Sequence, residues 1–129
     1  MDSLSEDSKP SLENIFLDFD HPNPNINHEA CMHMVRYWPK ESIEKLIVNL
    51  NSHDILLRRK SIKALGLFGL CALNPVVERF ADSKDRNTRV SCLKVLVHIA
   101  AKNHFEEIPD ALINIVELSF VDDEPEAIL

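Results

Sequence analysis

Apolar residues recur along this chain at helical spacing, and the whole pattern repeats with a period of about 31 residues. In the segment 43–50, the apolar positions 43, 46, 47 and 50 form one stripe of a helix. A shift by one period superposes three further sets of positions: Cys31, Ile62 and Leu93; Met34, Leu65 and Leu96; and Val35, Gly66 and Val97. Each copy holds two helical segments and buries only one face of each. The pattern therefore predicts an all-α fold in which two-helix repeats stack into an α-solenoid.

Polar residues and prolines mark the boundaries between the predicted helices. Asp54 and Asp85 are suited to cap the second helix of their copies, and the segments 20–24 and 74–75 contain residues that favour a helix start. Three copies are visible, and a fourth begins at 109–119 and continues to Leu129. We expect a disordered acidic tail over residues 1–10 and one repeat domain over residues 11–129.

The segments 50–58 and 80–90 show how the two helices of a copy are joined. In each, an Asp follows a polar turn and precedes an Arg by four residues, as in Leu50-Asn51-Ser52-His53-Asp54 with Arg58. These turns resemble those of HEAT repeats, although a period of about 31 residues is short for that class. Tetratricopeptide and ankyrin repeats have similar periods, but their signature residues are missing. The short copies resemble the HEAT-like repeats of the phycobiliprotein lyase family and its relatives in phycobilisome turnover.

The charge is unevenly distributed along the chain. The formal net charge of −7 argues against nucleic acid as the main partner, because phosphate binding needs a basic stripe or domain. Residues 41–103, however, carry a net charge of +5, whereas residues 1–40 and 104–129 carry −4 and −8. The basic centre therefore favours an acidic partner.

Other compositional features narrow the class of protein. No apolar run approaches the length that spans a bilayer, and the acidic N-terminus lacks the features of an export signal, so we expect a cytoplasmic protein without a membrane partner. The three cysteines, Cys31, Cys71 and Cys92, lie in apolar helical patterns without CxxC spacing. We interpret them as reduced thiols in the core.

The second helix of each copy should present its outward positions on one side of the stack. Positions 29, 32 and 36, then 60, 63 and 67, then 91, 94 and 98 occupy this register. The candidate partner-binding residues are Arg36, Lys60, Lys63, Lys94 and His98. Equivalent residues in packed helices lie roughly 10 Å apart, so these side chains predict a basic stripe for carboxylates. The alternative interpretation is that the lysines only keep the helices soluble.

Other candidate sites have structural explanations. Arg58 and Arg89 suit anion binding, but their spacing from Asp54 and Asp85 favours pairs on a helix surface. The nearest group to a metal-ligand cluster is His21, His28, Cys31 and His33. Only His28 and Cys31 share a helical face, and Cys31 is on the core register, so the group does not converge as zinc ligands should. We therefore predict no metal site, and no nucleophile with a base within reach indicates a catalytic site. Tyr37 and Trp38 suit either stacking on a flat ligand or closing the first copy.

The leading functional hypothesis is a non-enzymatic scaffold that binds an acidic protein and holds no cofactor of its own. The family resemblance suggests a phycobiliprotein as that partner. The alternative is a bilin lyase or lyase-like subunit that holds a tetrapyrrole by its propionates on Lys60, Lys63 and Lys94. A further expectation concerns Leu112, Ile113, Ile115 and Val116, which lack a complete second helix to cover them. They predict a homodimer through the C-terminal copy.

Overall fold

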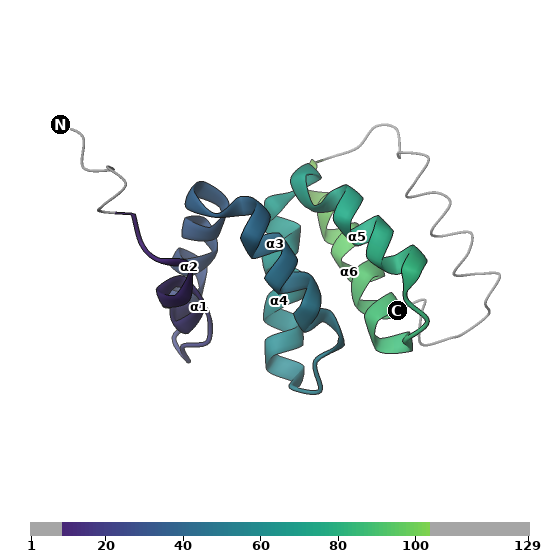
Figure 1. Cartoon of the computed structure of the whole chain (residues 1–129), viewed down its shortest axis with the longest axis horizontal. Coiled ribbons are helices and arrows are strands. Elements are labelled where there is room, and N and C mark those ends of the chain that lie inside the picture. Colours follow the sequence, from purple (N-terminus) through teal and green to yellow (C-terminus); the bar gives the residue numbers. More distant parts are fainter. Residues whose placement is uncertain (1–8, 104–129) are drawn as a thin grey trace. The chain divides into compact units, whose positions relative to one another are not determined.

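A computed structural model describes residues 9–103, and this part of the chain is entirely helical (Figure 1). The helices are α1 (Leu12–Phe19), α2 (Pro24–Tyr37), α3 (Pro39–Val48), the short 3₁₀ helix η2 (Asn49–Asn51), α4 (Ile55–Phe68), α5 (Leu70–Asp82) and α6 (Arg86–Asn103). The predicted all-α class is confirmed for the described residues. The predicted acidic tail lies outside them up to residue 8, and so does the C-terminal surface of the predicted dimer, which stays a prediction.

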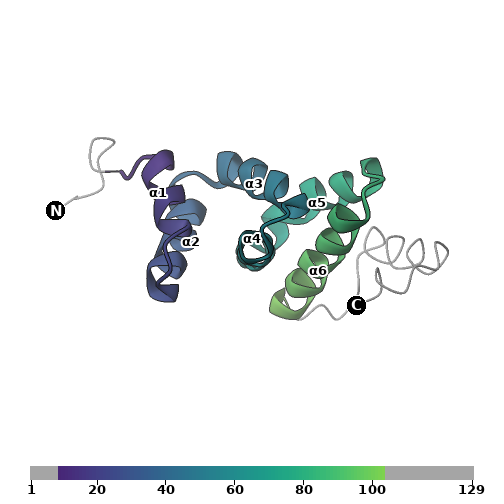
Figure 2. The same ribbon diagram turned by 90° about the horizontal axis from the view of Figure 1, so that it is seen from below.

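The chain divides into two compact units, residues 1–42 and residues 43–129. In the first unit α1 packs against α2, as both ribbon views show (Figures 1 and 2). Ile15 and Phe19 bury one side of α1, and Cys31 and Met34 are buried on α2. The side chain of Ser11 caps α1 by accepting a hydrogen bond from the N–H of Asn14.

Trp38 ends α2 and ties it to the start of the described chain. Its indole Nε1 donates a hydrogen bond of 2.9 Å to the carbonyl of Pro10. The ammonium of Lys9 lies 4.0 Å from the centre of the Trp38 ring. The indole is half-buried and one of its faces meets this cation, and these contacts support the structural interpretation of Trp38 as a closing residue.

In the second unit, α6 packs against both α4 and α5. Figure 1 shows that α4 and α6 run in the same direction. Helix α5, which lies between them in the sequence, runs in the opposite direction. Leu65 on α4 and Leu96 on α6 are completely buried, as is Met34 at the equivalent position of the first unit. This set of the predicted register is confirmed.

The predicted core face of α6 needs one correction. The repeat pattern places Val97 in the apolar register, but 68% of its surface is exposed. The buried face of α6 instead includes Cys92, Val95, Leu96 and Ile99. The reason is the helical period: residues 92, 95, 96 and 99 form one stripe, and Val97 lies on the opposite side of the helix.

Two expectations for the segment 69–75 were also wrong. Pro75 lies inside α5, which starts at Leu70 directly after Gly69. Gly69 has a φ of 64°, a conformation that glycine adopts without steric cost, so α4 and α5 are joined there by a single residue. The early start places Cys71 in the first turn of α5, where it is exposed, whereas Cys31 and Cys92 are buried as expected.

The turns before α2, α4 and α6 repeat the same hydrogen bonds at positions related by the repeat period. The caps are Asn23, Asp54 and Asp85, whose side chains accept from N–H groups in the first turn of each helix. Two residues before each cap, the side chains of His21, Ser52 and Ser83 accept from the N–H of the cap residue. The predicted caps Asp54 and Asp85 are therefore confirmed, and Asn23 is their counterpart in the first copy.

The residue four positions after each cap also has one role in all three turns. Asn27, Arg58 and Arg89 each donate to the carbonyl six residues earlier, at distances of 2.6, 2.8 and 3.3 Å. Arg89 also donates to the carbonyl of Phe80 and stacks on its ring. The two arginines thus have a structural role through bonds to main-chain carbonyls, and their predicted pairing with Asp54 and Asp85 stays a prediction.

Candidate functional site

The structure places the predicted basic residues on three helices. Arg36 is on α2 in the first unit, whereas Lys60 and Lys63 are on α4, and Lys94 and His98 are on α6 in the second unit. Lys63, Lys94 and His98 are exposed, and Lys60 is half-buried. The four residues of the second unit lie on helices that pack together.

A close contact between α4 and α6 brings part of this set together. Gly66 is buried and lies directly against His98, so that a Cβ on Gly66 would be 2.7 Å from the Cβ of His98. Lys63 precedes Gly66 by one helical turn, and Lys94 precedes His98 by one turn. The two lysines therefore border the line along which α4 and α6 meet.

We call the exposed or half-exposed side chains along this contact the α4–α6 face. It consists of Lys63, Leu67, Lys94, Val97 and His98. Within residues 9–103, no hydrogen-bond or ion-pair partner engages the ammonium groups of Lys63 and Lys94. Both side chains are exposed.

Lys102 is a further basic residue near this face that the periodic pattern did not predict. Its ammonium donates a hydrogen bond of 2.8 Å to the carbonyl of Leu67. Leu67 is in the last turn of α4, where carbonyls have no partner within the helix and a positive charge is favourable. The sequence gives little sign of this contact, because Leu67 is 35 residues away from Lys102. The only local signal is the position of Lys102 in the last turn of α6.

The repeat register assigns Ser91 to the outward side of the stack, and this prediction is wrong. Ser91 is buried, and its Oγ donates a hydrogen bond of 2.9 Å to the carbonyl of Leu50. Lys60, at the equivalent position of the previous copy, is half-buried. This position lies on the border of the packed face, so a short Ser there turns inward while a long Lys extends towards solvent.

Arg36 has its own surroundings in the first unit. Its guanidinium lies 5.3 Å from the centre of the Tyr37 ring, and the ring of His33 lies 5.8 Å from that of Tyr37. Met32 and Val35 are exposed on the same helix. This part of α2 thus also combines a cation with apolar and aromatic surface.

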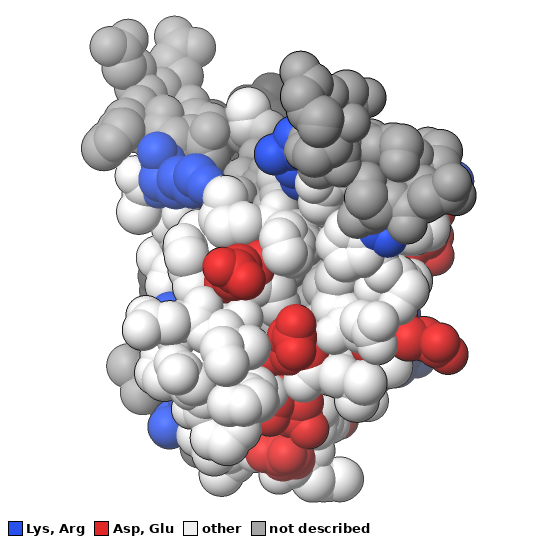
Figure 3. Space-filling model, turned by 90° about the vertical axis from the view of Figure 1, so that its left-hand side faces the viewer, with Lys and Arg blue, Asp and Glu red and all other residues white. Residues whose placement is uncertain are grey.

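The two units differ in charge. Residues 9–42 carry three basic and five acidic side chains, a net −2, while residues 43–103 carry eleven basic and five acidic side chains, a net +6. The side of α1 and α2 is viewed in Figure 3, which shows acidic side chains along the middle of that face. The basic character predicted for the centre of the chain therefore belongs to residues 43–103, whereas residues 104–129 of the same unit carry −8.

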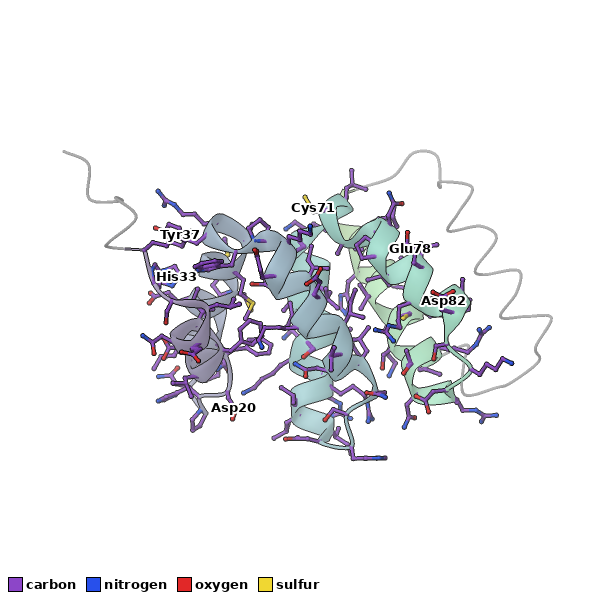
Figure 4. All side chains as sticks on the ribbon, viewed as in Figure 1. Asp20, His33, Tyr37, Cys71, Glu78 and Asp82 are labelled. Carbon is purple, nitrogen blue, oxygen red and sulfur yellow. The ribbon has the colours of Figure 1, made fainter. Side chains whose placement is uncertain are left out.

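Groups with catalytic or metal-binding chemistry are spread along the helices. In Figure 4, His33 and Tyr37 lie towards one end of α2, and Asp20 lies at the far end of its unit. On α5, Cys71 is in the first turn and is separated from Glu78 and Asp82 by two or more turns. Within residues 9–103 no group of three or more His, Cys, Asp or Glu side chains is placed to hold a metal ion. Cys31 is buried, as its register predicted.

None of the helices that the structure describes is long and apolar enough to cross a membrane.

Comparisons with known proteins find similarity to two cyanobacterial proteins. It is 25% identical over 115 residues to the uncharacterized phycocyanin operon protein Z of Pseudanabaena tenuis (strain PCC 7409), covering 89% of this chain and 57% of that protein. It is 26% identical over 97 residues to the bilin biosynthesis protein CpeZ of Synechococcus sp. (strain WH8020), covering 75% of this chain and 52% of that protein. The chain thus spans about half the length of these curated relatives.

No family model matches the chain, and no solved structure matches it. The similarity to the two cyanobacterial proteins supports the resemblance to bilin-handling proteins that the short repeats suggested.

Proposed function

We propose that this chain handles a bilin, as a lyase-like subunit or chaperone that holds the open-chain tetrapyrrole for transfer to a phycobiliprotein. The observation that carries the proposal is the similarity over most of the chain to a phycocyanin operon protein and to a bilin biosynthesis protein. The periodic recurrence of the turn contacts supports the finer proposal that the scaffold is an α-solenoid of HEAT-like repeats.

The chemistry of a bilin suits the second unit. A bilin has a long conjugated apolar body and two propionate groups, which are ionised at neutral pH. Residues 43–103 carry a net charge of +6 within a unit whose net charge is −2, and exposed ammonium groups on the neighbouring helices of this segment can bind the carboxylates of such a dianion. The role assigned to this chain is binding and presentation of the chromophore.

Absorbance spectroscopy tests the proposal directly. Purified protein is titrated into biliverdin, used as a bilin probe, and a red-shifted and sharpened long-wavelength band is expected because a bound tetrapyrrole is held in fewer conformations. The same chain unfolded in urea serves as control and should leave the spectrum of free biliverdin unchanged. A native chain that produces no spectral change at tens of micromolar would overturn the proposal.

A second candidate function follows from the charge of residues 43–103. A scaffold that binds an acidic protein through the basic segment 43–103 would also explain the exposed cations on α4 and α6. Titration with chromophore-free phycocyanin, followed by calorimetry at two salt concentrations, tests this function. Binding that weakens steeply with salt is expected of a charge-driven interface, and an absence of binding at low salt would exclude it.

A further inference from the structure

The α4–α6 face combines features that solubility does not require. On α6, Val97 lies between Lys94 and His98 in the sequence, and 68% of its surface is exposed. On α4, Leu67 follows Lys63 by one turn and is half-buried. A helix surface that only keeps a protein soluble needs charges alone. An apolar strip bordered by cations instead suits a ligand that is both apolar and anionic.

The spacing of the two cations is set by the packing of the helices. Gly66 has no side chain, so the backbone of α4 approaches His98 of α6 more closely than larger residues would allow. Interaxial distances for packed helices are about 8–10 Å, and this contact favours the short end. Lys63 and Lys94 occupy equivalent positions on these two helices, and their flexible stems can converge on two carboxylates of one molecule.

We propose that the α4–α6 face is the bilin-binding surface, with one propionate on Lys63, the other on Lys94, and the conjugated body against Val97 and Leu67. This inference rests on the proposed bilin-handling function and adds where and how the ligand is held. Charge complementarity favours this occupant, because a dianion meets two cations without partners among the described residues, and its apolar body covers Val97.

His98 completes the surface. Its Cβ is fixed against Gly66, while its imidazole remains exposed beside Val97. The ring can stack on the ligand or donate a hydrogen bond to a lactam oxygen at the end of a bilin. Neither contact requires a change in the backbone.

The test compares biliverdin with its dimethyl ester, which keeps the conjugated body but lacks both carboxylates. Wild type should bind biliverdin at least about tenfold more tightly than the ester, since a hydrogen bond to a charged group contributes on that scale. In the double variant Lys63→Gln/Lys94→Gln, biliverdin should bind as weakly as the ester. Val97→Ser should weaken acid and ester by the same factor.

Lys84→Gln provides the matched control. Lys84 is an exposed lysine before α6, and the first residue of that helix is about 12 Å along the axis from Lys94. This variant should bind both probes as wild type does. Circular dichroism and urea unfolding should show that all four proteins fold equally, because the replaced side chains are exposed.

The outcomes separate the two proposals. If wild type binds biliverdin but the double variant keeps the full preference for acid over ester, the α4–α6 face is not the binding surface and bilin handling stands. If wild type binds neither probe, the proposed function itself fails.

Discussion

Gly66 on α4 and His98 on α6 lie so close together that a Cβ on the glycine would be 2.7 Å from the Cβ of the histidine and 3.4 Å from its Cγ. Gly66 is inside a helix, where glycine costs about 1 kcal/mol relative to alanine. The residue therefore serves the packing of two helices at the expense of local helix stability.

We expect Gly66→Ala to lower the free energy of unfolding by about 1–3 kcal/mol, because the new methyl group overpacks the contact. His98→Ala should not relieve this loss, since alanine at position 98 keeps the Cβ with which the new methyl group clashes. His98→Gly removes that atom, and in a double-mutant cycle it should show favourable coupling with Gly66→Ala. Urea unfolding measures the wild type, the three single variants and the two double variants, and a Gly66→Ala variant more stable than wild type would contradict the contact.

Replacing each of two buried serines by alanine should have opposite effects on the free energy of unfolding. Within the described residues, the hydroxyl of Ser61 has no hydrogen-bond partner, whereas that of Ser91 donates to the carbonyl of Leu50. Ser61→Ala should be neutral or stabilising, and Ser91→Ala should cost roughly 1–3 kcal/mol because it removes a buried hydrogen bond. Thermal unfolding at one pH compares the two variants. Equal losses from both would show that the Leu50 carbonyl contact is not formed.

Stability should depend on pH through the cap of α6. The backbone N–H of Thr88 and then its hydroxyl donate to the carboxylate of Asp85, at 2.9 and 2.8 Å, and lower the pKa of that carboxyl. The ordinary pKa of an aspartate, about 3.9, applies to the unfolded chain, and the pKa of Asp85 in the folded chain is lower. The ionised cap therefore stabilises the fold above about pH 3.9, and this stabilisation is lost as the pH falls through the folded-state pKa.

Asp85→Ala should therefore cost about 1 kcal/mol at pH 7, and its difference from wild type should shrink below about pH 4. Urea unfolding at several pH values follows this difference. Asp82→Ala is the control, because Asp82 ends α5, where a negative charge opposes the helix dipole. It should be neutral or slightly stabilising at pH 7. A pH-independent effect of Asp85→Ala would argue against the ionised cap.

The thiols should differ in reactivity. Cys71 is exposed, whereas burial raises the pKa of Cys92 to about 12, outweighing the opposing effect of the positive charges on Arg79 and Arg89. We expect one of the three thiols to react rapidly with Ellman's reagent at pH 8, and Cys71→Ser to abolish that fast phase. Cys31 and Cys92 should react only as the protein opens. Two or more fast thiols in the native wild type would contradict the burial of these residues.

The helices and the period that relates them could be predicted from local sequence alone. The repeat register predicted that residues 34, 65 and 96 are core positions, and all three are completely buried. It also predicted the caps Asp54 and Asp85, because a cap depends on hydrogen bonds between residues two or three positions apart. Local spacing carries that information without knowledge of the rest of the fold.

Burial beside the core stripe, and the long-range contacts, depend instead on how the helices pack. Ser91 lies next to the core stripe of α6 and is buried with its hydroxyl on the carbonyl of Leu50, whereas Val97 lies on the opposite side of the helix and is exposed. The bond from Lys102 to Leu67 and the approach of His98 to Gly66 join residues more than 30 positions apart. Such contacts depend on how closely two helices pack, and a periodic pattern along one chain does not specify that distance.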